Sequence, residues 1–216
     1  RHTGIGADGV LFTGVADGRP FLRVRNADGS TAEMCGNGVR CVALFLRERG
    51  LVSQDAFVLD TDAGPHSVRV LSAERVEVGM RPASLVPADL PLASARPWID
   101  EPIEVARHAL RVTAVSMGNP HAVTFDEVPR DAVGPALEVD PRFPERVNAG
   151  FATRTAAGLD LAVWERGVGW TRACGTGACA AAVAAVETGR AARDEDLRVT
   201  LTGGELVIRV GAPGEP

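Results

Sequence analysis

The chain has 216 residues, of which 45% are hydrophobic and 24% charged, and this composition is typical of a globular protein with a core of useful size. Its formal net charge of −5 and the lack of a basic block argue against nucleic acid as the main partner. No apolar run reaches the ~18–20 residues that cross a bilayer, and no signal-peptide segment opens the sequence, so we expect a cytoplasmic protein with no membrane partner.

The first half of the sequence predicts strands around one helix. Residues 21–28, 67–72 and 74–80 alternate or cluster β-branched residues as strands do. A helix is expected to begin at the glycines of residues 36–38 and to end near Gly50, a plausible C′ glycine. Residues 82–102 then contain five prolines and predict a linker or irregular crossing rather than a packed element.

The second half repeats this order. Strands are expected at 109–118 and 159–167, a helix from the glycines of residues 175–177 to near Gly189, and a hairpin over 197–211 that turns at Gly203–Gly204. We interpret the repetition as a weak internal duplication, although two short motifs can also coincide by chance. The predicted fold is α+β, with two pseudo-symmetric halves, residues 1–81 and 82–216, each a mostly antiparallel or mixed sheet wrapped around a central helix.

Four cysteines fall in two pairs, Cys35 with Cys41 and Cys174 with Cys179. Four are too few for a disulfide scaffold in a chain of this length, and only the second pair has a spacing that structural zinc sites use, so zinc is a remote alternative. All 23 basic residues are arginine, and without lysine the chain cannot form the Schiff base that holds PLP. We therefore expect no metal and no cofactor.

Cys35 and Cys174 each stand directly before Gly-x-Gly at the expected start of a helix. Unpaired N–H groups and the helix dipole at such a site bind a carboxylate and can lower a thiol pKa from ~8.5 to ~3.5–7.5. Two such thiols on opposite faces of one carbon acid would serve as base and acid for stereoinversion. Cys41 and Cys179 lie inside the helices among apolar residues, and we expect them to be buried packing residues.

Five blocks in order resemble the diaminopimelate epimerase family, which epimerises an amino acid of the lysine and peptidoglycan pathway without a cofactor. They are RHTGIGADG (1–9), RNADGSTAEMCGNGVRC (25–41), SMGNPHAV (116–123), WERGVG (164–169) and ACGTGACA (173–180). Proline racemases share the fold and the thiol pair, but Asn37 stands where they usually carry histidine. The resemblance covers nearly the whole chain.

The resemblance implies a role for each matching residue. Cys35 and Cys174 would be the thiolate base and the thiol acid that interconvert LL- and meso-diaminopimelate, with His121 supporting their ionisation. Glu165 would face the α-ammonium group and Arg166 would form a fork to the distal carboxylate. The remaining substrate-binding residues would be Gly36, Asn37, Gly175 and Thr176 at the reacting carboxylate and Asn26, Asn119 and Asn148 at the distal centre. The family usually forms homodimers.

The chain departs from the family pattern at its ends. The family opens with a Gly-Asn-Asp-Phe block that does not precede Arg1, so we expect the first strands to be missing, and the closing strand to be missing or altered. Gly9 stands where some members carry glutamine. Two alternatives therefore remain open: a racemase or epimerase of another amino acid on the same fold, and a truncated, non-catalytic binding module.

Overall fold

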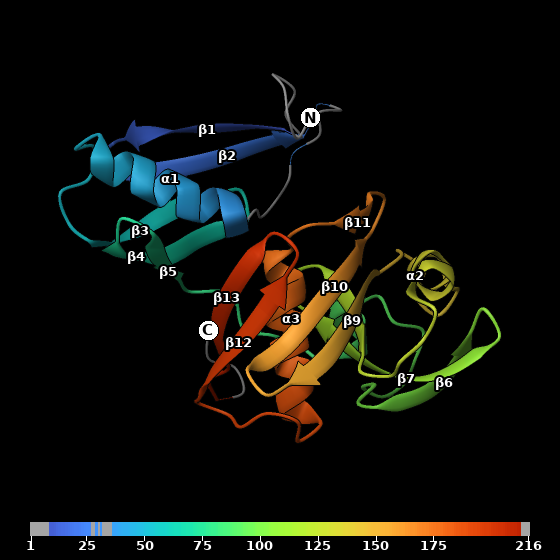
Figure 1. Ribbon diagram of the computed structural model, residues 1–216. Coiled ribbons are helices and arrows are strands. Elements are labelled where there is room, and N and C mark those ends of the chain that lie inside the picture. Colours follow the sequence, from blue (N-terminus) through green and yellow to red (C-terminus); the bar gives the residue numbers. More distant parts are fainter. Residues whose placement is uncertain (1–8, 27–28, 30, 32–35, 213–216) are drawn as a thin grey trace. The chain divides into compact units, whose positions relative to one another are not determined.

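The computed structural model describes residues 9–26, 29, 31 and 36–212, and the chain divides into two compact units, Arg1–Met80 and Arg81–Pro216 (Figure 1). Each unit combines a mixed sheet with helix, which confirms the predicted α+β class. Within the described residues, no helix is both long enough and apolar enough to cross a bilayer.

The first unit contains a five-stranded sheet in the order β1-β2-β3-β4-β5. Its strands are β1 (Gly9–Ala16), β2 (Arg19–Asn26), β3 (Ala56–Thr61), β4 (Gly64–Ser72) and β5 (Arg75–Val78). Only β2 and β3 run parallel, and the other neighbours are antiparallel. The strands expected over 21–28, 67–72 and 74–80 are thus confirmed as β2, β4 and β5, whereas β1 and β3 were not predicted.

Helix α1 (Gly36–Glu48) lies along one face of this sheet (Figure 1). Its buried residues Val39, Val42, Ala43 and Leu46 recur at the spacing of one helical face and pack on apolar residues of β2, β3 and β4. Gly50 follows with φ of +67°, so the expected C′ glycine is confirmed. The thirteen-residue helix therefore starts within the first Cys-Gly-x-Gly motif, as its sequence indicates.

The second unit contains an eight-stranded mixed sheet in the order β13-β12-β10-β9-β8-β7-β6, with β11 paired to β10. The strands are β6 (Glu101–Val105), β7 (His108–Ser116), β8 (Pro120–Thr124), β9 (Asn148–Thr155), β10 (Gly158–Glu165), β11 (Gly169–Thr171), β12 (Asp196–Leu201) and β13 (Gly204–Arg209). The pairs β8–β9 and β10–β12 are parallel. The predicted strands at 109–118 and 159–167 and the hairpin turning at Gly203–Gly204 are confirmed.

Helix α3 (Gly175–Glu187) packs against six strands of the second unit, β7 to β10, β12 and β13 (Figure 1). Its residues 178 and 180–185 are all buried, and each is alanine or valine. Such small side chains let the surrounding strands approach the helix backbone on several sides. The second Cys-Gly-x-Gly motif thus opens a helix that is enclosed by the sheet.

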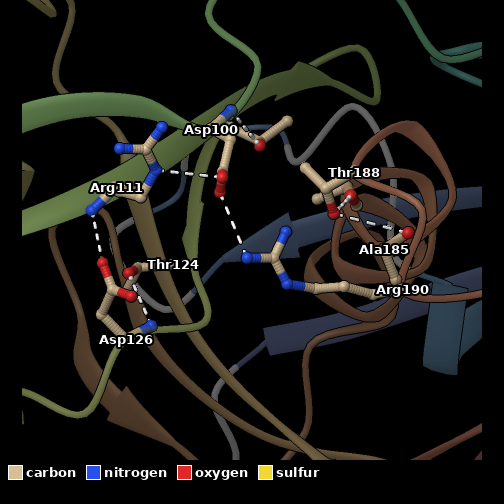
Figure 2. Close-up of polar contacts among 9 residues, drawn as sticks. Asp100, Arg111, Thr124, Asp126, Ala185, Thr188 and Arg190 are labelled. Atoms are coloured by element: carbon tan, nitrogen blue, oxygen red, sulfur yellow. Dashed lines mark hydrogen bonds and ion pairs between the residues drawn. The ribbon is translucent and has the colours of Figure 1, made fainter.

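The C-terminal end of α3 is held by a polar cluster that Figure 2 shows. Gly189 has φ of +70°, and the next amide, that of Arg190, donates to the carbonyl of Ala185 at 2.7 Å. The Arg190 guanidinium lies 3.3 Å from Asp100 and stacks over Phe125 at 4.6 Å. Asp100 also accepts from Arg111 at 3.0 Å (Figure 2). The segment that follows α3 is therefore tied to Asp100, the residue before β6, and through Asp100 to β7.

The proline-rich segment over 82–102 is irregular, but the prediction that it is not packed is wrong. Leu90, Leu92 and Trp98 are buried in the core of the second unit, and Trp98 meets Phe143 edge to face at a ring distance of 5.6 Å. Backbone hydrogen bonds also tie this segment to β7 and to the loop after α2 (Arg130–Glu138). The segment also contains a short 3₁₀ helix, η1 (Pro87–Asp89), and its last two residues begin β6, while apolar side chains between its prolines pack into the core.

Candidate active site

Cys174 is the N-cap of α3, and its Sγ accepts a hydrogen bond from the Gly177 amide at 3.3 Å. The thiol is buried, with 7% of the residue exposed. A Cβ at position 177 would lie 3.1 Å from this Sγ and 3.1 Å from a methyl group of Val163. Glycine is therefore the residue that lets the first turn of α3 close around the sulfur.

The ionisation of Cys174 differs from the expectation. Burial, and next the negative charge of Glu165, raise the pKa of Cys174 to about 12, although the Gly177 amide and the Thr176 hydroxyl act in the opposite direction. The prediction that the helix start lowers this pKa is wrong for Cys174, because removal from water and a neighbouring carboxylate outweigh two hydrogen bonds. At neutral pH Cys174 is a protonated thiol.

Glu165 ends β10 and faces the thiol from the hairpin that β10 forms with β11. The hydroxyl of Thr171 donates to Glu165 Oε1 at 2.5 Å. Thr171 pairs with Val163, two residues before Glu165, so both side chains lie on the same face of the hairpin. Thr171 was not predicted from the sequence. The one sequence signal for Thr171 is that strand side chains alternate between the two faces on either side of the Arg166–Val168 turn, which places Thr171 on the same face as Glu165.

Asn119 contacts the Cys174 motif at Thr176, and His121 contacts Asn119. The Asn119 amide donates to the Thr176 hydroxyl at 3.4 Å, and Asn119 Oδ1 lies 3.1 Å from His121 Nε2. Burial, and then the charge of Arg166, lower the pKa of His121 to about 3. The imidazole is therefore neutral, and because Oδ1 only accepts, Nε2 carries the proton. His121 supplies an N–H group here rather than the positive charge that would support a thiolate.

Asn148 and Arg166 connect this region to the hairpin. The Asn148 side chain is buried, donates to the Pro120 carbonyl at 2.8 Å and accepts from the Arg166 amide at 2.9 Å. The Arg166 guanidinium donates to the Glu145 carbonyl at 3.0 Å. The second unit thus brings together seven of the residues singled out in the sequence, namely Asn119, His121, Asn148, Glu165, Arg166, Cys174 and Thr176, with Gly175 in the first turn of α3.

The other candidates belong to the first unit. Cys35 and the side chain of Asn26 lie outside the described residues. Gly36 and Asn37 are the first residues of α1, and Asn37 Oδ1 accepts from Arg40 at 2.7 Å.

The other two cysteines lie inside the helices α1 and α3. Cys41 is exposed and Cys179 half-buried, so the expectation of buried packing is wrong for Cys41, which lies on the solvent side of the amphipathic α1. Among the described residues, no group of three or more His, Cys, Asp and Glu side chains is placed to hold a metal.

A sequence model of the family described as diaminopimelate epimerase matches residues 1–86 and 113–216. The chain belongs to the diaminopimelate epimerase family. It is 42% identical to the diaminopimelate epimerase of Geobacillus kaustophilus, over 99% of this chain and 78% of the relative. The protein of the same name from Pseudomonas entomophila is 43% identical, over 100% of this chain and 80% of the relative. The one from Desulforudis audaxviator is 46% identical, over 96% of this chain and 78% of the relative. The family suggested by the five sequence blocks is confirmed.

Solved structures similar to this chain confirm the fold. A probable proline racemase from Agrobacterium radiobacter has a TM-score of 0.68 at 16% identity, over 96% of this chain and 69% of that one. A phenazine biosynthesis protein of the PhzF family from Bacillus anthracis also scores 0.68, at 15% identity, over 94% of this chain and 76% of that one. At these identities the likeness concerns architecture and not chemistry.

Proposed function

We propose that the chain interconverts LL- and meso-diaminopimelate without a cofactor, by proton transfer between the substrate α-carbon and the side chains of Cys35 and Cys174. Membership of the diaminopimelate epimerase family supports the reaction. The observation that carries the assignment of Cys174 is its setting: a buried thiol at the N-terminus of an enclosed helix, beside the carboxylate of Glu165. Cys35 takes the matching place in the first Cys-Gly-x-Gly motif.

The protonated state of Cys174 supports a part as proton donor in the first step of our proposal. As a thiol it donates a proton to one face of the α-carbon, while Cys35, as a thiolate, removes the α-proton from the opposite face. The electron pair of the broken C–H bond passes into the α-carboxylate and returns to form the new C–H bond. In the reverse direction the two side chains exchange roles.

Backbone N–H groups at the helix starts hold the reacting carboxylate. Those of Gly175 and Thr176 lie in the first turn of α3, where N–H groups lack intrahelical partners and the helix dipole favours negative charge. Gly36 and Asn37 offer the same groups at α1. Fixed dipoles of this kind stabilise the charge that develops on the carboxylate as the proton leaves.

Glu165 couples substrate binding to the ionisation of Cys174. Its negative charge contributes to the raised pKa of the thiol, and it faces the substrate α-ammonium. An ammonium group placed there neutralises the carboxylate, so the pKa of Cys174 falls when substrate binds. A lower pKa makes Cys174 a stronger proton donor in the first step and leaves it as a thiolate that can act as the base in the reverse direction.

The amides and Arg166 recognise the distal end of the substrate. Arg166 forms a fork to the distal carboxylate, and Asn26, Asn119 and Asn148 distinguish the configuration of the distal carbon. His121, which is neutral, orients Asn119 through their hydrogen bond. In our proposal the two halves, residues 1–81 and 82–216, each supply one cysteine, and the enzyme works as a homodimer in the cytoplasm on the lysine pathway, as the family resemblance implies.

Solvent-deuterium exchange tests the reaction. The unsubstituted chain should incorporate deuterium at the α-carbon of diaminopimelate in D₂O, and Cys35→Ala and Cys174→Ala should each abolish this. Cys41→Ala, which removes an exposed thiol from α1, is the matched control and should exchange normally. Binding of diaminopimelate without exchange by the unsubstituted chain would instead indicate the non-catalytic binding module.

A further inference from the structure

The turn Glu165–Gly169 carries the two charged side chains that we propose to face the substrate, those of Glu165 and Arg166. The backbone amides of residues 166–168 each donate a hydrogen bond. The amide of Val168 donates within the turn, to the Glu165 carbonyl at 3.0 Å. The other two donate outside it: that of Arg166 to Asn148 Oδ1 at 2.9 Å, and that of Gly167 to Glu138 Oε1 at 2.8 Å. Two buried side chains from elsewhere in the fold therefore define the path of this turn.

Glu138, the last residue of α2, makes a second contact with the same segment. Its Oε2 accepts from the indole N–H of Trp164 at 2.6 Å, while Oε1 accepts from the Gly167 amide. Trp164 directly precedes Glu165, and Gly167 directly follows Arg166. A single carboxylate therefore holds the chain immediately before and immediately after the Glu165–Arg166 pair.

The carboxylate of Glu138 is buried and ionised. Only 8% of the residue is exposed, and Arg146 lies 3.6 Å from Oε1. Burial alone would raise the pKa of Glu138, but the Trp164 indole, the Gly167 amide and Arg146 together lower it below its usual value. Hydrogen bonds to an ionised acceptor are stronger and more directional than those to a neutral one, so this residue fixes geometry as well as packing.

We propose that Glu138 is a positioning residue for the epimerase reaction: by holding Trp164 and Gly167 it fixes the orientation in which Glu165 faces Cys174 and Arg166 faces the distal carboxylate of the substrate. This proposal rests on the proposed function. Glu138 lies 28 residues before Arg166, at the end of a different element, and none of its described contacts is with Cys174. Its effect on catalysis is exerted through the backbone of the turn.

Glu138→Gln tests the proposal, with Asp131→Asn as the matched control. Asp131 lies on the same helix and also accepts from an indole N–H, that of Trp170 at 2.8 Å, but it bonds no amide of the turn. A displacement of about 1 Å at a substrate-facing group can reduce a rate by about 10²-fold, so we expect Glu138→Gln to lower kcat/KM by about tenfold or more. Asp131→Asn should stay within about twofold of the unsubstituted enzyme.

The separate effects of Glu138→Gln on KM and on kcat distinguish a positioning role of Glu138 from a loss of stability. A lesion in folding alone lowers the active fraction, and thus kcat, while KM for diaminopimelate stays constant. Misplacement of Arg166 raises KM instead, because its contact with the distal carboxylate is weakened. A Glu138→Gln enzyme with unchanged KM and unchanged kcat per folded molecule would overturn the proposal.

Amide hydrogen exchange can be measured without enzyme activity, so it tests the positioning role of Glu138 separately from the proposed epimerase reaction. Amide hydrogen exchange at Gly167 should accelerate in Glu138→Gln relative to Gly150 in β9, whereas equal protection in both proteins would contradict the positioning role. If the unsubstituted chain incorporates no deuterium at the substrate α-carbon, the proposed function fails, whatever the rate of amide hydrogen exchange at Gly167. Should Glu138→Gln not fold, Trp164→Phe removes the indole donor but keeps an aromatic ring, and unchanged KM and kcat in that variant would also overturn the proposal.

Discussion

The negative charge of Glu165 is, after burial, the largest influence that raises the pKa of the Cys174 thiol to about 12. Thr171 holds Glu165 in this position by a hydrogen bond of 2.5 Å. The carboxylate that is proposed to receive the substrate ammonium thus also favours the protonated form of the Cys174 thiol in the free protein.

Alkylation of Cys174 should accelerate when this charge is removed. In Glu165→Gln the pKa of Cys174 falls, so more thiolate is present at any pH between 7 and 9 and iodoacetamide reacts faster. Peptide mass spectrometry of the labelled protein measures the rate at Cys174, and the exposed Cys41 in the same sample serves as the internal standard. Equal rates at Cys174 in the two proteins would show that Glu165 does not control its ionisation.

The burial of His121 should make the second unit sensitive to acid. Its pKa is lowered from 6.5 to about 3 in the folded state, so below pH 6.5 the unfolded chain takes up a proton that the folded chain does not. Stability contributed by the neutral imidazole is complete above pH 6.5 and is lost at up to about 1.4 kcal/mol per pH unit as the pH falls towards 3.

Urea unfolding at pH 6.5 and 5.0 measures this loss. His121→Asn lacks the titrating group, so its free energy of unfolding should change less between the two values than that of the unsubstituted chain. Equal changes in both proteins would mean that His121 accepts a proton within the folded structure.

Arg166→Ala should weaken the binding of diaminopimelate. Loss of a charge-assisted contact of about 1.5–3 kcal/mol corresponds to a rise in KM of roughly 10- to 150-fold. Arg130→Ala, which removes an exposed guanidinium bonded to Thr153, is the control and should leave KM unchanged. Unchanged KM in Arg166→Ala, together with activity on an amino acid that lacks a distal carboxylate, would favour the alternative racemase.

Gly177→Ala should impair catalysis by displacing the thiol. The new methyl group would lie 3.1 Å from Cys174 Sγ, so the sulfur or the Val163 side chain must move by a few tenths of an ångström. Overpacking of this kind costs about 1–3 kcal/mol, which the better helix propensity of alanine offsets by at most about 1 kcal/mol.

Gly150→Ala is the control for this variant, because its Cβ would make only an ordinary contact with Val123 at 3.4 Å. We expect normal deuterium exchange in Gly150→Ala and a fall of at least about tenfold in Gly177→Ala. Normal exchange in Gly177→Ala would show that the site tolerates a shifted sulfur.

The two helices that begin at Cys-Gly-x-Gly were predictable because glycine marks both of their ends in the sequence. Helix α2 was not predicted: it contains Gly134 and Pro135, which disfavour a helix when considered alone. In the structure Gly134 packs so closely on Trp164 that a Cβ would lie 3.2 Å from that side chain. Tertiary packing, which no local pattern contains, stabilises this helix.

Strands β8 and β9 were not predicted either, for a related reason. All five residues of β8 are buried, and the first five of β9 are as well, so neither strand shows the alternation by which a half-exposed strand is recognised. At the site, the resemblance identified the residues that carry charges and thiols. Glu138 and Thr171 act through hydrogen bonds to other side chains or to the backbone, and these partners become apparent only in the folded chain.

The enclosure of α3 has a consequence for how this scaffold can change. Residues 178 and 180–185 offer no space for larger side chains, so mutational drift in the thiol-bearing helix is strongly restricted. The Glu165–Gly169 turn is less restricted, because Val168 is 72% exposed and the bond from Arg166 to Asn148 uses the Arg166 backbone amide. Substitutions at Val168 should therefore be tolerated far better than substitutions at the buried positions of α3.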